Sequence, residues 1–345
     1  FKRFIPLKLE NISANSDLKV QFNFPLKSKL KFEEFIINSK TNLTDVNIND
    51  IFSRDFNSNL LSIDLSNDGL DIVGKVNSSN QTLNLIWEQD FKKKDNSTLI
   101  SLSGSINDKM INNFVNDKLK FSGTVDVEAN FIGNSFDLRE GDLFLDFRNT
   151  KIESYILDWA KPKFSSMFLK SNINFSDDKE INFYNFKIEG PLIQVDGNFN
   201  FKNNRIENIS LKKFKSYSSN DIISNNFSLK YSDSFHSLLE LSIIGDVLTI
   251  GRDGLSNLIN FNNSSSNHKN IMINIFFDEL ISKSKLNFKN AQFFYNKKLN
   301  KLTDLSLNAF LNGESVIFGE VTEQKNIKEI KLFTKNFESL IDVLG

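Results

Sequence analysis

The sequence predicts a mainly β fold, a long curled antiparallel sheet that forms a repeating β-groove and carries a few short capping helices. Apolar and polar residues alternate with a period of two over long stretches, and short clusters of Asn, Asp, Lys and Gly separate these stretches. Side chains of a strand point to alternate faces, so this alternation gives a sheet with one apolar and one polar face. With 4 Pro and 14 Gly among 345 residues, we expect long strands with few interruptions.

The alternating runs indicate which residues should face the interior of the sheet. One run covers residues 125–131, and others cover 195–201, 239–243, 271–277 and 305–311. The inward candidates, which would line the groove, are Val125, Val127, Ala129, Phe131, Val195, Phe199, Leu305, Leu307 and Leu311. The alternation slips by one between Phe183 and Phe186, which predicts a β-bulge there.

Turn signals lie between the predicted strands, as in a series of hairpins. The four clearest are Asn67-Asp68-Gly69, Glu140-Gly141-Asp142, Lys202-Asn203-Asn204 and Asn312-Gly313-Glu314. The basic cluster at residues 92–94, followed by Asp95, is predicted to be a solvated turn.

Helices are expected in few places. Residues 108–116, 251–261 and 337–344 carry apolar residues at helical spacing, and residues 154–159 predict a short helix or turn before Lys161-Pro162. Residues 262–270 are rich in Ser and Asn and predict a loop. We therefore expect an N-terminal β-groove segment over residues 1–130, a middle segment over 131–262, and a further series of strands over 271–345.

Composition excludes several classes of function. The net charge of −1 argues against a nucleic-acid-binding protein, and the absence of Cys excludes disulfides and thiolate metal sites. The two histidines, His236 and His268, fall in a predicted turn and in the polar loop, where a catalytic base is not expected. No nucleophile elbow, zinc-protease motif or phosphate-binding loop is present, so we expect neither an enzyme nor a cofactor or metal site.

Three stretches carry a resemblance to a known family. They are residues 69–91 (GLDIVGKVNSSNQTLNLIWEQDF), residues 157–202 with LDWAKP and FKIEGPLIQVDGNFNF, and residues 239–258 with LELSIIGDVLTIGRDGLSNL. In this order they resemble the AsmA-like superfamily of Gram-negative envelope proteins, in the branch related to YhdP and TamB. Residues 271–345 are similar to the start of the AsmA-like C-terminal region. The resemblance covers nearly the whole chain, but glycines common in such turns are replaced here, for example by Asn203-Asn204.

The resemblance implies a function in the cell envelope. Members are anchored in the inner membrane by an N-terminal helix, project into the periplasm, and form a curled sheet with an apolar groove. Relatives are implicated in moving phospholipid to the outer membrane. The expectation is therefore non-enzymatic phospholipid transport between the inner and outer membranes, by a periplasmic segment whose anchor lies upstream of Phe1. The expected partners are phospholipid acyl chains and the two membranes.

An apolar sheet face has to be covered by something. A fatty chain would suit an open trough, since each buried methylene gains about 0.8 kcal/mol and ~15 of them gain on the order of 10 kcal/mol before costs. The alternative is a structural or scaffolding envelope protein in which the same residues form a closed core. A β-helix enzyme that acts on polysaccharides is a third possibility, disfavoured by the two Trp and the lack of a clear acidic cluster.

Overall fold

The computed structural model of the chain is almost entirely β. It describes residues 12–26, 36–51, 54–78, 81–112, 119–134, 137–154, 157, 159–176, 180–202, 205–217, 223–234, 237–250, 270–281, 286–299, 301–311, 314–324 and 327–335. Its elements in chain order are β1 (Ile12–Ser16), β2 (Lys19–Asn23), β3 (Ile36–Ile51), β4 (Arg54–Ser66), β5 (Gly69–Ser78), β6 (Gln81–Asp90), β7 (Thr98–Asn107), α1 (Asp108–Asn112), β8 (Leu119–Asn134), β9 (Asp137–Asp146), β10 (Thr150–Ser154), β11 (Trp159–Lys161), β12 (Phe168–Ser176), β13 (Glu180–Gly190), β14 (Ile193–Lys202), β15 (Arg205–Tyr217), β16 (Ile223–Ser234), β17 (Leu238–Thr249), β18 (Asn270–Ile281), β19 (Asn287–Lys298), β20 (Lys301–Leu311), β21 (Glu314–Gln324) and β22 (Ile327–Thr334).

The chain divides into two compact units. Unit 1 consists of Phe1–Met110, Thr124–Phe147 and Leu169–Phe183, and unit 2 of Ile111–Gly123, Arg148–Phe168 and Tyr184–Gly345. The boundary that we expected between residues 130 and 131 lies within β8.

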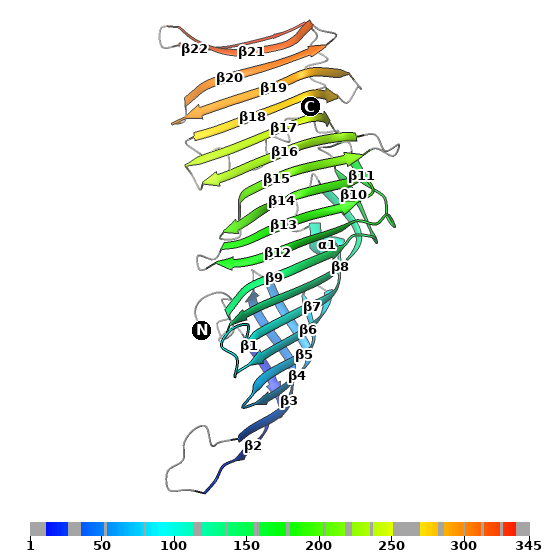
Figure 1. Ribbon diagram of the computed structural model, residues 1–345, viewed down its shortest axis with the longest axis vertical. Helices are drawn as coiled ribbons and strands as arrows, with labels where there is room; N and C mark the ends of the chain where they lie inside the picture. The colour runs from blue at the N-terminus through cyan, green and yellow to red at the C-terminus, as the bar shows by residue number, and fades with distance from the viewer. Residues whose placement is uncertain are drawn as a thin grey trace. The chain divides into compact units, whose positions relative to one another are not determined.

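Unit 1 is an antiparallel meander in which β3 to β9 pair in chain order (Figure 1). On its other edge β3 pairs with both β1 and β2, which follow one another along it. β9 also pairs with β12.

Unit 2 contains a second meander, in which one of the neighbouring strand pairs is parallel. β14 to β17 pair antiparallel in chain order, β17 pairs parallel with β18, and β18 to β22 pair antiparallel again. A parallel pair needs a crossover of a dozen or more residues, and residues 250–269 provide that length. A smaller sheet is formed by the first residues of β8 with β10 and β11.

The predicted fold class, a long and mainly antiparallel sheet with few helices, is confirmed. The turn predicted at 67–69 separates β4 from β5, and residues 92–94 form an exposed turn between β6 and β7 as predicted, whereas residues 203–204 and 312–313 of the other two predicted turns lie outside the described residues. The predicted bulge in β13 is also confirmed. Tyr184 and Asn185 are both exposed, and Asn185 has a φ of 51°.

One local prediction was wrong. Glu140-Gly141-Asp142 is not a turn but the middle of β9, where Gly141 lies opposite Phe131. A glycine in a strand often marks a close approach of a neighbour, and this one faces an aromatic ring. Of the two structures predicted for residues 154–159, the turn is the one that the pairing supports, because Ser154 and Trp159 are cross-strand partners in the β10–β11 hairpin.

The predicted helix at 108–116 is confirmed over Asp108–Asn112. The predicted helices at 251–261 and 337–344 and the loop over 262–269 lie outside the described residues. In the described part of the chain, no helix is long and apolar enough to cross a bilayer.

Candidate functional site

One face of the unit 1 sheet carries an uninterrupted apolar row. We call it the unit 1 row, and each member is the direct cross-strand partner of the next from β3 to β9. It consists of Leu43, Leu61, Gly74, Leu85, Leu102, Ala129 and Leu143. Strands lie about 4.8 Å apart, so the row is about 30 Å long, similar to the hydrocarbon thickness of a bilayer.

The opposite face of unit 1 is mainly polar and held together by side-chain hydrogen bonds between strands. Ser62 Oγ donates to Asn42 Oδ1 at 2.9 Å, and Ser101 Oγ donates to Asn130 Oδ1 at 2.7 Å. Lys40 forms an ion pair with Asp64 at 2.9 Å, and the hydrogen bond from Lys40 to Asp64 raises the pKa of the lysine. The two faces therefore differ in chemistry, as the alternation in the sequence predicts.

The apolar face of unit 1 is neither solvent-exposed nor sealed. Leu61 and Ala129 are buried, whereas Leu43, Leu85, Leu102 and Leu143 are only partly buried. One cluster of buried apolar side chains at this face consists of Val46, Leu61 and Val76, with partly buried leucines and Ile72 around it, and Ile100, Val125 and Ala129 are also buried on this face. Side chains in the interior of a closed sandwich are close-packed, so this face has the burial of an interior that is not completely covered.

Unit 2 carries a corresponding row, which we call the unit 2 row. It crosses β14 to β22 and passes through the parallel pair without a break. It consists of Gly197, Leu211, Leu229, Ile243, Ile275, Phe293, Leu307, Gly319 and Leu332.

The centre of the unit 2 row is tightly packed. Ile243 is 1% exposed and Ile275 is 2% exposed, and both belong to a cluster of buried side chains from β16 to β20. Aromatic rings complete the cluster. Phe227 stacks on Phe214 at 4.6 Å between ring centroids and meets Phe277 edge-on at 6.0 Å. The flanking members Leu211, Phe293 and Leu307 are partly buried. This part of unit 2 has the character of an ordinary protein core.

The small sheet of unit 2 contributes to the same cluster. Leu157 forms an antiparallel bridge with Ile250 and packs against the cluster, and the Trp159 indole donates a hydrogen bond to the Leu192 carbonyl at 3.0 Å. Lys161 is buried although it is a lysine. Its Nζ donates to the carbonyls of Thr150 at 2.7 Å and Pro162 at 3.1 Å.

The residues predicted to line a groove lie in both units. Within each unit they share the apolar face. Val125, Ala129 and Val195 are buried, whereas Val127, Phe131, Phe199, Leu305, Leu307 and Leu311 are partly buried. Phe131 also contacts Phe175 of β12 edge-on, with ring centroids 5.8 Å apart. The first four, Val125, Val127, Ala129 and Phe131, lie together on β8. Val195 and Phe199 lie on β14, and Leu305, Leu307 and Leu311 lie on β20.

Several residues of the apolar faces were missing from the sequence-based set. Leu85 and Trp87 on β6 and Leu102 on β7 belong to the same face as Ala129 and Phe131. A signal for β6 was present in the sequence, because Leu83, Leu85 and Trp87 recur at every second position among Thr82, Asn84 and Glu88, although Ile86 interrupts the polar side. The buried Lys161 had no such signal.

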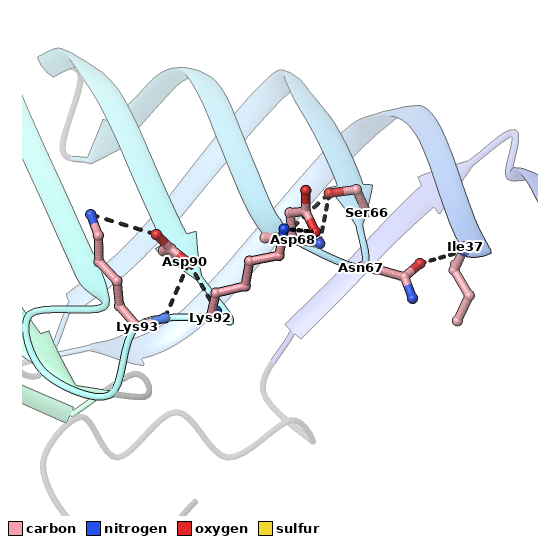
Figure 2. A network of polar contacts seen from close by, with 8 residues as sticks. Ile37, Ser66, Asn67, Asp68, Asp90, Lys92 and Lys93 are labelled. Carbon is pink, nitrogen blue, oxygen red and sulfur yellow. Dashed lines mark hydrogen bonds and ion pairs between the residues drawn. The ribbon is translucent and has the colours of Figure 1, made fainter. Parts of the chain in front are cut away.

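A polar network joins two successive turns at one end of the unit 1 strands (Figure 2). Lys92 Nζ pairs with Asp68 at 2.6 Å, and Lys93 Nζ lies 3.5 Å from Asp90. The backbone amide of Lys92 donates to Asp90, and this hydrogen bond is the main reason why the pKa of Asp90 is lowered. Ser66 Oγ accepts hydrogen bonds from the backbone amides of Asp68 and Gly69, so these residues stabilise the turn between β4 and β5.

The described residues contain no group of three or more His, Asp or Glu side chains placed to hold a metal ion. His236 and His268 lie outside the described residues. Comparison with protein families, with curated proteins and with solved structures finds no match to this chain.

Proposed function

We propose that the chain is a non-enzymatic lipid-transport segment that takes up phospholipid acyl chains on the apolar face of unit 1. The observation that carries the proposal is the unit 1 row, an apolar strip across β3 to β9 whose central leucines are only partly buried. Hydrophobic contact has no preferred direction, so an acyl chain could move along such a strip without a specific site.

The sequence resemblance supports the wider setting of this proposal. A periplasmic segment, part of a longer protein anchored in the inner membrane, would pass phospholipid between the inner and outer membranes along such strips. Neither an enzymatic reaction nor a cofactor is part of the proposal.

A scaffolding function is the second candidate, and unit 2 favours it. Ile243, Ile275 and Phe277 are almost completely buried, so they fill a core and leave little of the centre of the unit 2 row for a ligand. A chain with this function alone would have a stable sheet and no bound lipid. The two candidates therefore differ in whether the unit 1 face can be reached by a hydrocarbon chain.

The two tryptophans allow a direct test, because Trp87 lies on unit 1 and Trp159 on unit 2. In the Trp159→Phe variant, Trp87 is the sole indole and reports on the apolar face of unit 1. We expect phospholipid brominated on its acyl chains to quench Trp87 fluorescence, while the same lipid without bromine leaves it unchanged. The Trp87→Phe variant is the matched control, since Trp159 is buried and hydrogen-bonded.

A second substitution makes the test specific for the row. Leu102→Asp places a carboxylate in the middle of the apolar strip and should abolish quenching of Trp87 in a protein that retains its β circular dichroism. If folded protein shows no quenching at any lipid concentration and co-purifies with no phospholipid in native mass spectrometry, the scaffolding function is the correct one.

A further inference from the structure

The outer edge of unit 1 exposes large apolar side chains at alternate positions. Leu18 is 62% exposed, Val20 37%, Phe22 56%, Phe24 46% and Leu26 96%. Val20 and Phe22 lie within β2, and all of its residues are exposed. Single apolar residues on a surface are common, but five at alternate positions along one edge indicate an interaction surface.

The register shows which face these side chains extend. Val20 lies opposite Ser39 of β3 and Phe22 opposite Ile37. Ile37 and Ser39 share a face with Leu43, because they are separated from it by even numbers of residues along β3. The exposed side chains of β2 therefore continue the apolar face of unit 1 to its edge. Among the described pairings, β2 pairs with β3 alone, which leaves its other backbone edge available.

We propose that β2 pairs antiparallel with β2 of a second copy of this chain, around a twofold axis at Gln21. The sequence of the strand is self-complementary in this register. Val20 faces Phe22 of the other copy and Leu18 faces Phe24, all on the apolar face, while Lys19 faces Asn23 on the polar face. Aromatic and β-branched residues are favourable cross-strand partners, and no two like charges are opposed.

A twofold arrangement also explains why one copy has this edge exposed. An isologous interface uses the same patch on both partners. It therefore closes on itself and yields a dimer, without larger assemblies. Pairing would join the apolar faces of two unit 1 sheets into one continuous surface. The inference stands on β2 alone and does not depend on whether lipid binds.

Cysteine cross-linking tests the register, because the chain contains no cysteine. Gln21→Cys puts a thiol opposite its own copy, where Cα atoms of directly opposed residues lie about 4.5–5.5 Å apart, within the range of a disulfide. Lys19→Cys is the matched control, since two copies of residue 19 would be about 13 Å apart along the strand. We expect a disulfide dimer from Gln21→Cys under mild oxidation and a loss of that product for Lys19→Cys.

Sedimentation velocity provides an independent measurement. The wild-type chain, of 39.6 kDa, should associate reversibly to twice that mass as its concentration rises. Phe22→Lys should remain monomeric at the same concentrations, and at concentrations low enough for the wild-type chain to be monomeric as well the two should share one thermal midpoint, because Phe22 is exposed in the single copy. A wild-type chain that stays monomeric, an assembly that grows beyond the dimer, or equal cross-linking of both cysteine variants would each overturn the proposal.

Discussion

Gly141 of β9 lies directly opposite Phe131 of β8, and a Cβ at this glycine would stand 2.6 Å from Cδ1 of the ring and 2.6 Å from the Asn130 carbonyl oxygen. The ring of Phe131 is thus accommodated by the absence of a side chain on the neighbouring strand. The glycine that looks like a turn signal in the sequence is a packing residue on the apolar face.

Gly141→Ala is accordingly expected to destabilise unit 1, because the neighbouring strand and ring must both shift to admit the methyl group. Overpacking of this kind costs about 1–3 kcal/mol. The urea midpoint in the Trp159→Phe background, followed by Trp87 fluorescence, measures it. Adding Phe131→Ala should recover part of the loss in Gly141→Ala, since the ring is half of the clash. If the double variant loses as much unfolding free energy as the two single variants lose together, this account is contradicted.

The packed centre and the partly buried flank of unit 2 should respond differently to a charge. Ile243→Asp buries a carboxylate in the cluster and should cost more than about 4 kcal/mol, enough to unfold unit 2. Leu307→Asp, on the partly buried flank, should cost less because its carboxylate keeps contact with water. Unfolding of both variants in the Trp87→Phe background, followed by Trp159 fluorescence, compares them. Ile243→Val, expected to cost about 0.5–1.5 kcal/mol, is the conservative control. Equal effects of the two Asp substitutions would show that the row is uniformly closed.

Lys161 should contribute both through packing and through its hydrogen bonds. Lys161→Met keeps most of the volume but leaves the Thr150 and Pro162 carbonyls without this donor, and we expect a loss of about 1–3 kcal/mol. Lys161→Ala also removes the buried stem and should cost more than Lys161→Met. Urea unfolding of both variants in the Trp87→Phe background can be followed by the fluorescence of Trp159, which lies in the same hairpin as Lys161. If Lys161→Met is as stable as the wild-type chain, the two hydrogen bonds make no net contribution.

The repeating alternation was sufficient to predict the fold class and the inward face of several strands. Apolar and polar residues alternate strictly from Val125 to Phe131 of β8, which predicts that Val125 and Ala129 face inward, and both are buried. Gly141 and Lys161 could not be assigned in this way, since their environments depend on residues from other strands. The difference in packing between Leu102 and Ile243 was also beyond prediction, because both lie in equally regular alternating runs and differ only in what surrounds them.

The ion pair between Glu279 of β18 and Lys289 of β19 should make the stability of unit 2 depend slightly on pH. The two residues are cross-strand partners, and the hydrogen bond from Lys289, aided by one from Asn287, lowers the pKa of Glu279. A lowered pKa in the folded state means that the stabilisation is present above the ordinary pKa of a glutamate and disappears as the pH falls through the lowered value. Both side chains are substantially exposed, so the contribution is at most about 1 kcal/mol. Glu279→Gln should therefore unfold at a lower urea concentration than the wild-type chain at pH 7, and the difference should vanish in acid and shrink in high salt. A difference that persists unchanged below the lowered pKa would show that Glu279 acts through packing and not through its charge.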